Sequence, residues 1–338
     1  GGTDGGNKEV IIANAKHLVA IDRPFTTIVA GNKSANDDIK AIFNEAGKDV
    51  VITENVMPQF NKLNIEPARD AIRQLFISRI IEAKGLNILQ AMTPYKIIPT
   101  PLAVLHACEL LSKGTKTQQG RGDLLAVDIG GATTDVYSMA SGEPTVDNTM
   151  LKGLPEPWMK RTVEGDLGMR YSLTHVFEQI PGADNSENEY MQQVKAWVEL
   201  CTARPDTLAA PGSEEEKLEE FLGRSAVSMA VERHCGRIAD VFTPLGLMHT
   251  QEGKDLMNVP SVIGIGGVLR NSRRPEEILK GSLYDFMHPE CTKPRKPKFY
   301  LDQKYIFASM GLLRSINPEL AFELLDKETV EIGCNATV

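Results

Sequence analysis

The sequence predicts an α/β protein, and three observations lead to this fold class. Helical and strand-like segments alternate along the first third of the chain, as they do where crossover helices join the strands of one sheet. Two apolar, strand-like segments run directly into glycine-rich turns, at 124–131 and 262–267. The length of 338 residues corresponds to two domains at about 150 residues each.

The first part of the chain is expected to alternate between helix and strand. Helices are expected at 8–18, 35–46 and 66–84, and strands at 26–30 and 50–53. The longest helix is predicted from apolar side chains that recur near the helical period, namely Ile72, Leu75, Phe76 and Ile80. Asn32 and Asn55 follow the two strands, where the loops of open α/β sheets bind ligands. The alternative is that each asparagine belongs to a plain turn, where this residue type is also common.

A domain boundary is expected between residues 118 and 119. Pro99-Thr100-Pro101 introduces a predicted helix at 102–112, and the polar segment 113–123 has the composition of a linker. Residues 1–118 are then the remainder of a first α/β domain, and 119–338 form a second. In the second, strands are expected at 124–127 and 134–139, and helices at 191–203, 214–242, 305–313 and 318–327, followed by a polar tail.

The turn after the first apolar strand has the residue types of a phosphate cradle. Gly130 and Gly131 lack Cβ atoms, so that backbone amides can approach an anion closely. Thr133 and Thr134 add hydroxyl donors. We predict that these four residues bind the phosphates of a nucleotide. The structural alternative is a tight hairpin in which Asp and Thr side chains satisfy the turn.

Two carboxylates flank this turn. Asp128 ends the strand and Asp135 follows the turn. Next to a phosphate, acidic side chains are favourable only if a cation such as Mg²⁺ lies between them, or if one of them positions a water molecule. We therefore predict Asp128 as a metal ligand and Asp135 as a candidate catalytic residue.

The second glycine cluster predicts another part of the same ligand site. Gly264, Gly266 and Gly267 again follow a β-branched strand, and polar residues come after them. Neither cluster has the spacing of a P-loop or of the dinucleotide fingerprint. Arg270 lies just past the turn, where it would stack on a nucleotide base or belong to an exposed charged turn.

These motifs resemble those of a known superfamily. Residues 128–135 are similar to the second phosphate motif of the actin, sugar-kinase and heat-shock-chaperone ATPases, and 263–270 are similar to their adenosine motif. More narrowly, the chain resembles the MutL/GlmL family, which is encoded beside adenosylcobalamin-dependent glutamate mutase and shares only a name with the DNA mismatch-repair MutL. That likeness extends over the chain and is carried by residues 1–7, 99–101, 128–137 and 162–168.

The resemblance implies two ribonuclease-H-like domains of the actin/hexokinase ATPase type, with the first one incomplete. No Asp-x-Gly-x-Thr hairpin, the first phosphate motif of the superfamily, occurs before residue 128, and the chain starts with Gly rather than Met. We therefore expect the N-terminal part of the first domain, and one wall of the nucleotide site, to be missing. ATP binding by this part of the protein is expected to be weak or absent.

The resemblance also implies a function. It predicts an ATP-dependent, chaperone-like reactivating factor that releases damaged cobalamin from a mutase, with ATP and Mg²⁺ as cofactors and mutase subunits as partners. The resemblance also implies that Glu164 is a second candidate, besides Asp135, for the carboxylate that orients the attacking water. Asp166 beside it is alternatively the N-cap of a helix at 169–177. The alternative functions are a small-molecule kinase of the same fold and a non-catalytic, partner-binding scaffold.

Composition excludes other classes of protein. The net charge of −8 and the pI near 5.4 argue against a nucleic-acid binder. No apolar run approaches the ~20 residues that span a membrane, so a cytoplasmic protein without a membrane partner is expected. The basic run at 293–298 is expected to be a solvated loop, and His234 to be structural rather than catalytic.

The five cysteines form no Cys-x-x-Cys pair. A zinc site or a disulfide framework is therefore not expected. We expect small buried thiols in a reducing compartment.

Overall fold

The computed structural model describes residues 2–60, 62–83, 87–154, 156–185, 187–244 and 246–333, without the side chains of 80–83, 87 and 89. The contacts divide the chain into two compact units, Gly1–Pro99 and Thr100–Val338. The expected domain boundary after residue 118 stays a prediction. The expected ends of two segments, at Lys84 and in the polar tail with Cys334, lie outside the described residues.

The first unit alternates between helices and strands, as the sequence predicts. Its elements are α1 (Glu9–Val19), β1 (Thr27–Val29), a short 3-10 helix (Lys33–Ala35), α2 (Asn36–Glu45), β2 (Val50–Ile52), α3 (Glu66–Ala83) and α4 (Asn87–Ala91). β1 and β2 are parallel, with Thr27 opposite Val50. Ile11, Ile39 and Phe43 of the two flanking helices form its buried core.

Asn32 and Asn55, the residues expected at strand ends, hold the N-terminal segment in place. Both side chains are buried. Asn32 donates to the carbonyl of Gly6 (2.9 Å), and Asn55 donates to the carboxylate of Asp4 (2.9 Å). Their hydrogen bonds are thus satisfied within the unit, as a structural turn requires.

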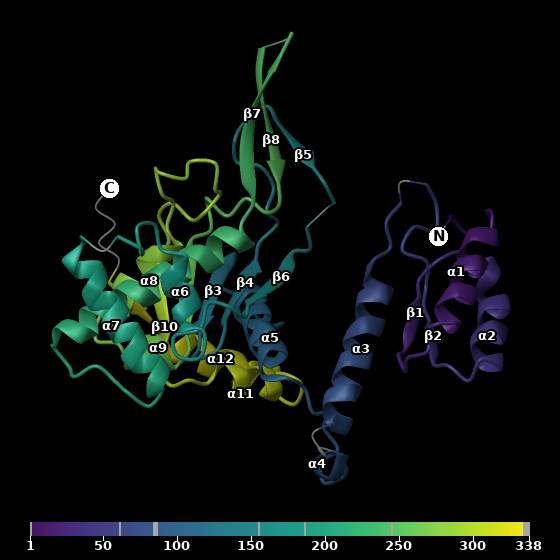
Figure 1. Ribbon diagram of the computed structural model, residues 1–338, viewed down its shortest axis with the longest axis horizontal. Helices are drawn as coiled ribbons and strands as arrows, with labels where there is room; N and C mark the ends of the chain where they lie inside the picture. The colour runs from purple at the N-terminus through teal and green to yellow at the C-terminus, as the bar shows by residue number, and fades with distance from the viewer. Residues whose placement is uncertain are drawn as a thin grey trace. The chain divides into compact units, whose positions relative to one another are not determined.

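The second unit contains two sheets. The larger has six strands in the order β11-β10-β9-β3-β4-β6, and the smaller has three in the order β5-β8-β7. The larger sheet comprises β3 (Leu124–Ile129), β4 (Thr134–Met139), β6 (Met159–Glu164), β9 (Ser261–Ile265), β10 (Lys298–Asp302) and β11 (Thr329–Ile332). The smaller comprises β5 (Thr149–Lys152), β7 (Arg237–Thr243) and β8 (Gly246–Glu252), and it projects from the body of this unit (Figure 1).

Helices cover both faces of the six-stranded sheet, which confirms the α/β class. They are α5 (Thr100–Lys113), α6 (Leu173–Glu178), α7 (Glu189–Ala203), α8 (Glu214–His234), α9 (Gly267–Asn271), α10 (Pro275–Leu279), α11 (Phe307–Leu313) and α12 (Pro318–Glu328). Because side chains alternate along a strand, Leu125 and Val127 of β3 pack with α6, α7 and α8. Leu124 and Ala126 pack with α5, α11 and α12. Ribonuclease-H-like topology stays a prediction.

One helix of the second unit packs through a glycine. A Cβ added at Gly311 of α11 would lie 1.8 Å from the carbonyl oxygen of Ala103 in α5. Only glycine therefore permits this approach of the two helices.

Two expected elements end differently. The helix predicted at 214–242 was too long, because α8 ends at His234 and residues 237–243 form β7. Gly236 marks the change: an added Cβ would lie 2.8 Å from the carbonyl oxygen of Glu252, so the backbones touch there. The tail after α12 begins as the strand β11, which pairs antiparallel with β10.

The basic run at 293–298 is exposed as expected at Arg295, Lys296 and Lys298, but not at its first residue. Lys293 is buried, with 1% of its surface exposed, and its amine donates to Ser228 Oγ (2.9 Å). Lys298 begins β10. Among the described residues, no helix is long and apolar enough to cross a membrane.

Candidate functional site

The two glycine turns lie directly against each other, as the sequence predicts. Strands β3 and β9 are parallel neighbours, with Asp128 opposite Ile265. Gly266 has φ +102°, and a Cβ there would lie 2.4 Å from the carbonyl oxygen of Ile129 and 2.7 Å from Asp128 Oδ1. A side chain at position 266 would therefore separate the two turns.

The turn between β3 and β4 presents free backbone amides. These antiparallel strands pair Asp128 with Asp135, and the Gly130 amide closes the turn by donating to the Thr133 carbonyl (2.9 Å). Within the described ranges, no acceptor is recorded for the amides of Gly131, Ala132 and Thr133. Successive unpaired amides in a turn form an anion-binding concavity.

A cavity of about 590 Å³ opens beside both turns. This volume falls within the range of roughly 300–1,000 Å³ that small-molecule sites occupy. Its walls come from the two turns, the segment before α8, the first turns of α8 and the helices α9 and α10. The lining residues used below are Gly130, Gly131, Arg170, Glu216, Glu219, Glu220, Gly267, Asn271, Ser272 and Arg273.

Five of the eight predicted binding residues do not line this cavity, namely Thr133, Thr134, Gly264, Gly266 and Arg270. Thr134 is buried, and its hydroxyl donates to the Leu167 carbonyl. An added Cβ at Gly264 would lie 2.9 Å from Leu269 Cδ1, so this glycine serves packing within β9. Arg270 is exposed, and its Nε donates to the Gln303 carbonyl (3.2 Å).

Sequence reasoning missed the charged wall of the cavity. Arg170 forms an ion pair with Glu219 (2.6 Å), and Arg273 lies 3.7 Å from Glu216. Glu216, Glu219 and Glu220 share one face of α8, since they are spaced at i, i+3 and i+4. The sequence shows this spacing, but it does not show that this face of α8 lines the cavity.

Asp128 is a carboxylate at the end of β3 that could hold a cation. Burial, followed by the nearby carboxylates of Asp135 and Asp302, raises its pKa to about 6. Its carboxylate accepts no hydrogen bond and joins no ion pair within the described part of the chain. The same residues contain no group of three or more His, Cys, Asp or Glu that could hold a metal ion alone. A single carboxylate suits Mg²⁺, which takes its other ligands from water and substrate phosphates.

Asp135 is already paired with an arginine that the sequence analysis did not select. Oδ1 of Asp135 accepts from Arg161 Nε (2.8 Å) and contacts Nη2 (2.7 Å), while Oδ2 lies 3.4 Å from Thr133 Oγ1. Burial raises the pKa of Asp135, and the Arg161 charge opposes that rise. Arg161 comes from the neighbouring strand β6, and a charged residue inside a strand was the only signal for it.

Glu164 and Asp166 share another arginine. Arg233 Nη1 lies 2.6 Å from Glu164 and 2.8 Å from Asp166, and Nη2 donates to Asp166 (2.9 Å). The hydrogen bonds from Arg233 lower the pKa of Asp166 to about 2. The alternative role of Asp166 as a helix N-cap was wrong, because α6 begins after Ser172.

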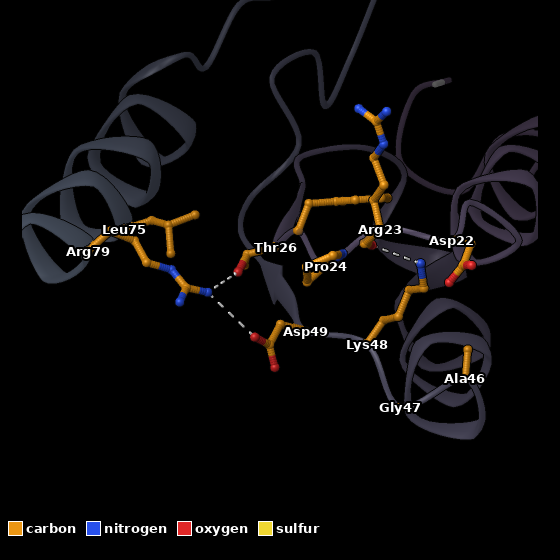
Figure 2. Close-up of a pocket in the computed structure, with 11 residues that line it drawn as sticks. Asp22, Arg23, Pro24, Thr26, Ala46, Gly47, Lys48, Asp49, Leu75 and Arg79 are labelled. Carbon is orange, nitrogen blue, oxygen red and sulfur yellow. Dashed lines mark hydrogen bonds and ion pairs between the residues drawn. The ribbon is translucent and has the colours of Figure 1, made fainter. Parts of the chain in front are cut away.

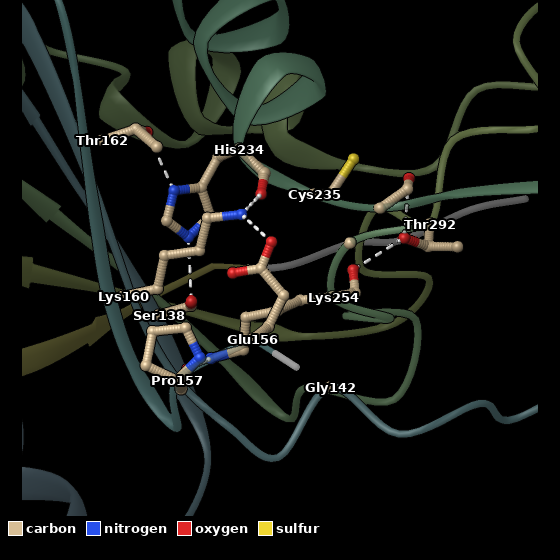
Figure 3. A network of polar contacts seen from close by, with 12 residues as sticks. Ser138, Gly142, Glu156, Pro157, Lys160, Thr162, His234, Cys235, Lys254 and Thr292 are labelled. Atoms are coloured by element: carbon tan, nitrogen blue, oxygen red, sulfur yellow. Dashed lines mark hydrogen bonds and ion pairs between the residues drawn. The ribbon is translucent and has the colours of Figure 1, made fainter. Parts of the chain in front are cut away.

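A polar network centred on His234 joins the end of α8 to residues of β4 and β6 (Figure 3). His234 bridges Ser138 Oγ and Thr162 Oγ1, at 2.8 Å each. Burial lowers the pKa of His234 well below its usual value, as expected for a structural histidine. Lys160 contacts Glu156 (2.9 Å) and the His234 carbonyl (3.1 Å).

The first unit has a separate cavity of about 730 Å³ at the amino ends of β1 and β2. Arg79 of α3 points toward Thr26 and Asp49, at 2.8 Å and 3.6 Å (Figure 2). The Lys48 amine donates to the carbonyls of Ile21 and Arg23. Nothing in the sequence analysis selected this cavity.

Of the eleven predicted site residues, the structure therefore gathers those of the two turns and their flanking carboxylates at one end of β3, β4 and β9. This arrangement defines an α/β protein with two adjoining glycine turns and a cavity at the ends of neighbouring strands. The chain matches the MutL protein family over residues 1–329, and it belongs to that family. It is 45% identical to "Protein MutL" of Clostridium tetanomorphum over 335 residues, which cover 98% of this chain and 72% of that protein. The resemblance to the MutL/GlmL family, inferred from the motifs, is thus confirmed.

Proposed function

We propose that the protein binds ATP with Mg²⁺ in the cavity beside the two glycine turns. The observation that supports this most directly is the close approach of Gly266 to the backbone of Ile129, since one ligand could then contact both motifs. The free amides of Gly131, Ala132 and Thr133 would hold the phosphates. Asp128 would hold the cation.

The rest of the cavity suits a nucleoside. Carboxylates of Glu216, Glu219 and Glu220 can accept hydrogen bonds from ribose hydroxyls, as acidic residues do in other nucleotide sites. Asn271 and Arg273 offer donors and a planar guanidinium on the facing wall.

Bound Mg-ATP would supply a transferable phosphoryl group whose charge the metal neutralises. Asp135 and Glu164 are the carboxylates next to the phosphate turn, on the neighbouring strands β4 and β6, where Asp135 pairs with Val163 and Glu164 pairs with Thr134. Each is held by an arginine, so neither is free to move. Asp135 lies directly opposite Asp128 in the β3–β4 pair. We therefore assign to Asp135 the role of orienting the attacking water, and Glu164 is the alternative residue for this role.

We further propose that the whole protein is a reactivating factor for an adenosylcobalamin-dependent mutase of the glutamate mutase type. Membership of the MutL family supports this partner. A nucleotide-dependent change between two domain arrangements is an established physical route for such work. In that mechanism, mutase subunits are the partners and damaged cobalamin is released.

The first experiment measures Mg-ATP binding and hydrolysis by the intact protein, with a matched pair of glycine variants. In Gly131→Ala, the added Cβ meets only ordinary contacts with Arg170, at 3.6 Å, so the fold is retained while the phosphate approach is blocked. We expect the dissociation constant to rise by about tenfold or more, equivalent to about 1.4 kcal/mol. Gly333→Ala, whose Cβ would meet no atom within 4 Å, should bind as the wild type does.

The second experiment supplies the intact protein and Mg-ATP to an inactivated adenosylcobalamin mutase. Restored activity that Gly131→Ala loses would support the proposal. ATP consumption that depends on a small-molecule acceptor would instead favour a kinase. Thermal stability unchanged by Mg-ATP at 100 times the expected dissociation constant, where about 2.7 kcal/mol is due, would favour a scaffold.

A further inference from the structure

The outer edge of β7 is a free edge of the projecting three-stranded sheet. In the order β5-β8-β7, this strand has a neighbour on one side only. Its pairing with β8 runs without interruption from Arg237 to Thr243, so no bulge turns the edge away. Residues 239–243 contain neither Pro nor Lys, the residue types that commonly protect an edge strand. The hairpin extends beyond the body of the second unit (Figure 1), which leaves this edge open within the unit.

The chain itself occupies only the base of this edge. The Ile238 amide donates to the Glu290 carbonyl (2.8 Å), and the Thr292 amide donates to the Gly236 carbonyl (3.0 Å). This pairing is antiparallel. The outer edge of β7 therefore accepts an antiparallel strand, and the part beyond Ile238 continues an edge that is already paired at its base.

Two residues beyond the base present unpaired backbone groups. Backbone groups along a strand point alternately to its two sides, so the outward amide of Ile238 makes Asp240 and Phe242 the next outward-facing residues. Within the described part of the chain, no partner is recorded for the amides and carbonyls of these two residues. Pro244 has no N–H and ends the free stretch.

This short stretch is complementary to a second copy of itself. When two β7 strands run antiparallel about a two-fold axis at Val241, Asp240 of each copy lies opposite Phe242 of the other. Each such pair exchanges both of its hydrogen bonds, so all outward groups of these residues find a partner. A longer strand would meet Pro244 at one end and the occupied Ile238 amide at the other. The length of the free stretch therefore fits a second copy.

The side chains agree with this register. Val241 would face Val241 of the other copy, and cross-strand pairs of apolar side chains stabilise a sheet. On the opposite face, Phe242 lies opposite Leu247 of its own hairpin. It also comes within reach of Phe242 of the other copy, since diagonal neighbours are about 7–8 Å apart. All three apolar side chains are exposed in the single chain, while Asp240 keeps its own partner, His249 Nδ1, at 2.9 Å.

We propose that two copies of the protein associate through their β7 edges into one continuous sheet, in the order β5-β8-β7-β7-β8-β5. The interacting surface is residues 239–243, and its partner is the same surface of a second copy. Two-fold pairing uses this edge on both copies, so the surface accepts no third copy. The association does not depend on the proposed nucleotide function.

The first test places a cysteine on the two-fold axis. In Val241→Cys, the two Cα atoms belong to a non-hydrogen-bonded pair and lie about 4.5 Å apart, a separation that a disulfide spans. Mild oxidation of the full chain should give a crosslinked dimer, of twice the 37.1 kDa of one chain, that dithiothreitol separates. The wild type, whose four described cysteines are buried, is the background control.

The register itself is tested by two further cysteine variants. Ala239 would lie opposite Thr243 of the other copy, so two copies of Ala239→Cys hold their thiols roughly 14 Å apart along the strands. Ala239→Cys alone should therefore not crosslink, whereas its mixture with Thr243→Cys should. Crosslinking of Val241→Cys no faster than that of Ala239→Cys alone would overturn the proposal.

Sedimentation equilibrium of the full chain measures the association without a new thiol. The wild type should change from monomer to dimer as its concentration rises. Val241→Lys should raise the dimer dissociation constant by about tenfold or more, because like charges would then lie directly opposite each other. Met150→Lys, on β5 at the other edge of the same sheet, is the matched control and should associate as the wild type does.

The sedimentation outcomes also decide the proposal. A wild-type chain that stays monomeric up to roughly 1 mM would overturn it, and so would equal association of the two lysine variants. Val241 is 39% exposed and Met150 is 59% exposed, so neither substitution is expected to unfold the chain, which circular dichroism verifies. The wild-type measurement stands without any variant.

Discussion

The two sheets of the second unit are stabilised in different ways. In β4 of the six-stranded sheet, all six residues are buried. In β7 of the three-stranded sheet, five of seven are exposed, and Phe242 is 86% exposed. The first sheet therefore depends on apolar burial on both faces. The second depends on its ladder hydrogen bonds and cross-strand pairs, so equivalent substitutions in the two sheets should have very different effects.

The largest difference is expected for a leucine in each sheet. Leu125→Ala in β3 should destabilise by about 2–5 kcal/mol, because Leu125 is 0% exposed and its loss leaves a cavity. Leu247→Ala in β8, where the side chain is 47% exposed, should cost about 0.5 kcal/mol or less. Urea unfolding followed by tryptophan fluorescence measures both, since Trp158 and Trp197 lie in this unit. Similar costs for the two variants would remove the contrast between the sheets.

Two glycines with positive φ give the next comparison. Gly266→Ala combines an unfavourable backbone conformation (φ +102°) with a clash against Ile129, and should cost about 3 kcal/mol or more. Gly246→Ala at the start of β8 has φ +115° but no atom within 4 Å of the new Cβ, and should cost about 1–2 kcal/mol. The same unfolding measurement applies, and loss of Mg-ATP binding should accompany only Gly266→Ala. Equal destabilisation by both would mean that the two glycine turns do not touch.

Asp128 is expected to behave oppositely to most site residues, since its replacement should stabilise the protein. Its pKa is raised from 3.8 to about 6, so the folded state binds the proton more tightly than the unfolded state does. Stability should therefore fall by up to about 3 kcal/mol as pH rises from about 4 to above 6. Asp128→Asn should remove this dependence and stabilise by about 1–3 kcal/mol at pH 7, while it weakens Mg-ATP binding.

The control for this prediction is Asp240→Asn in β7. The Asp240 side chain is 62% exposed and pairs with His249, so the change should stay within about 0.5 kcal/mol. Denaturant unfolding between pH 4 and pH 8 distinguishes the two variants. A wild-type stability that does not decline over this range would contradict the environment assigned to Asp128.

The smallest difference is expected between two arginines: Arg233, in the last turn of α8, and Arg237, the first residue of β7. Arg233→Ala removes contacts with Glu164 and Asp166 and should cost about 1 kcal/mol, since its side chain is 37% exposed. Arg237→Ala, with a side chain 57% exposed, should cost about 0.5 kcal/mol or less. The Arg233 effect should shrink in 1 M salt. Because the pKa of Asp166 is lowered to about 2, its contribution should be present above pH 4 and be lost as pH falls toward 2.

The helices and strands that were predicted correctly are those whose position follows from a short, local pattern of residues. Apolar runs ending in glycine located β3 and β9, and the helical period located α3 and α12. The end of α8 was missed although Arg233, His234 and Gly236 carry a helix-termination signal, with basic residues in the last turn and a glycine just beyond. β7 was missed because its exposed residues give no buried, alternating pattern.

The candidate site was predictable only in part for the same reason. Gly130, Gly131 and Gly267 were found because a turn beside an anion requires a local residue type. Arg161 and Arg170 were not, because their roles come from pairing with Asp135 and Glu219 across long sequence separations. Such pairing depends on the register of strands and the packing of helices, which no single window of sequence contains.

Helix α8 connects the cavity beside the glycine turns with the base of the β7–β8 hairpin. With 21 residues it is about 32 Å long. Its first turns line the cavity through Glu216 and Glu219, and its last residues lead into Cys235 and the projecting hairpin. By simple geometry, a 5° tilt of a rod of about this length displaces one end by nearly 3 Å relative to the other. A small adjustment of the helix around a ligand would therefore become a movement of atomic size at the hairpin.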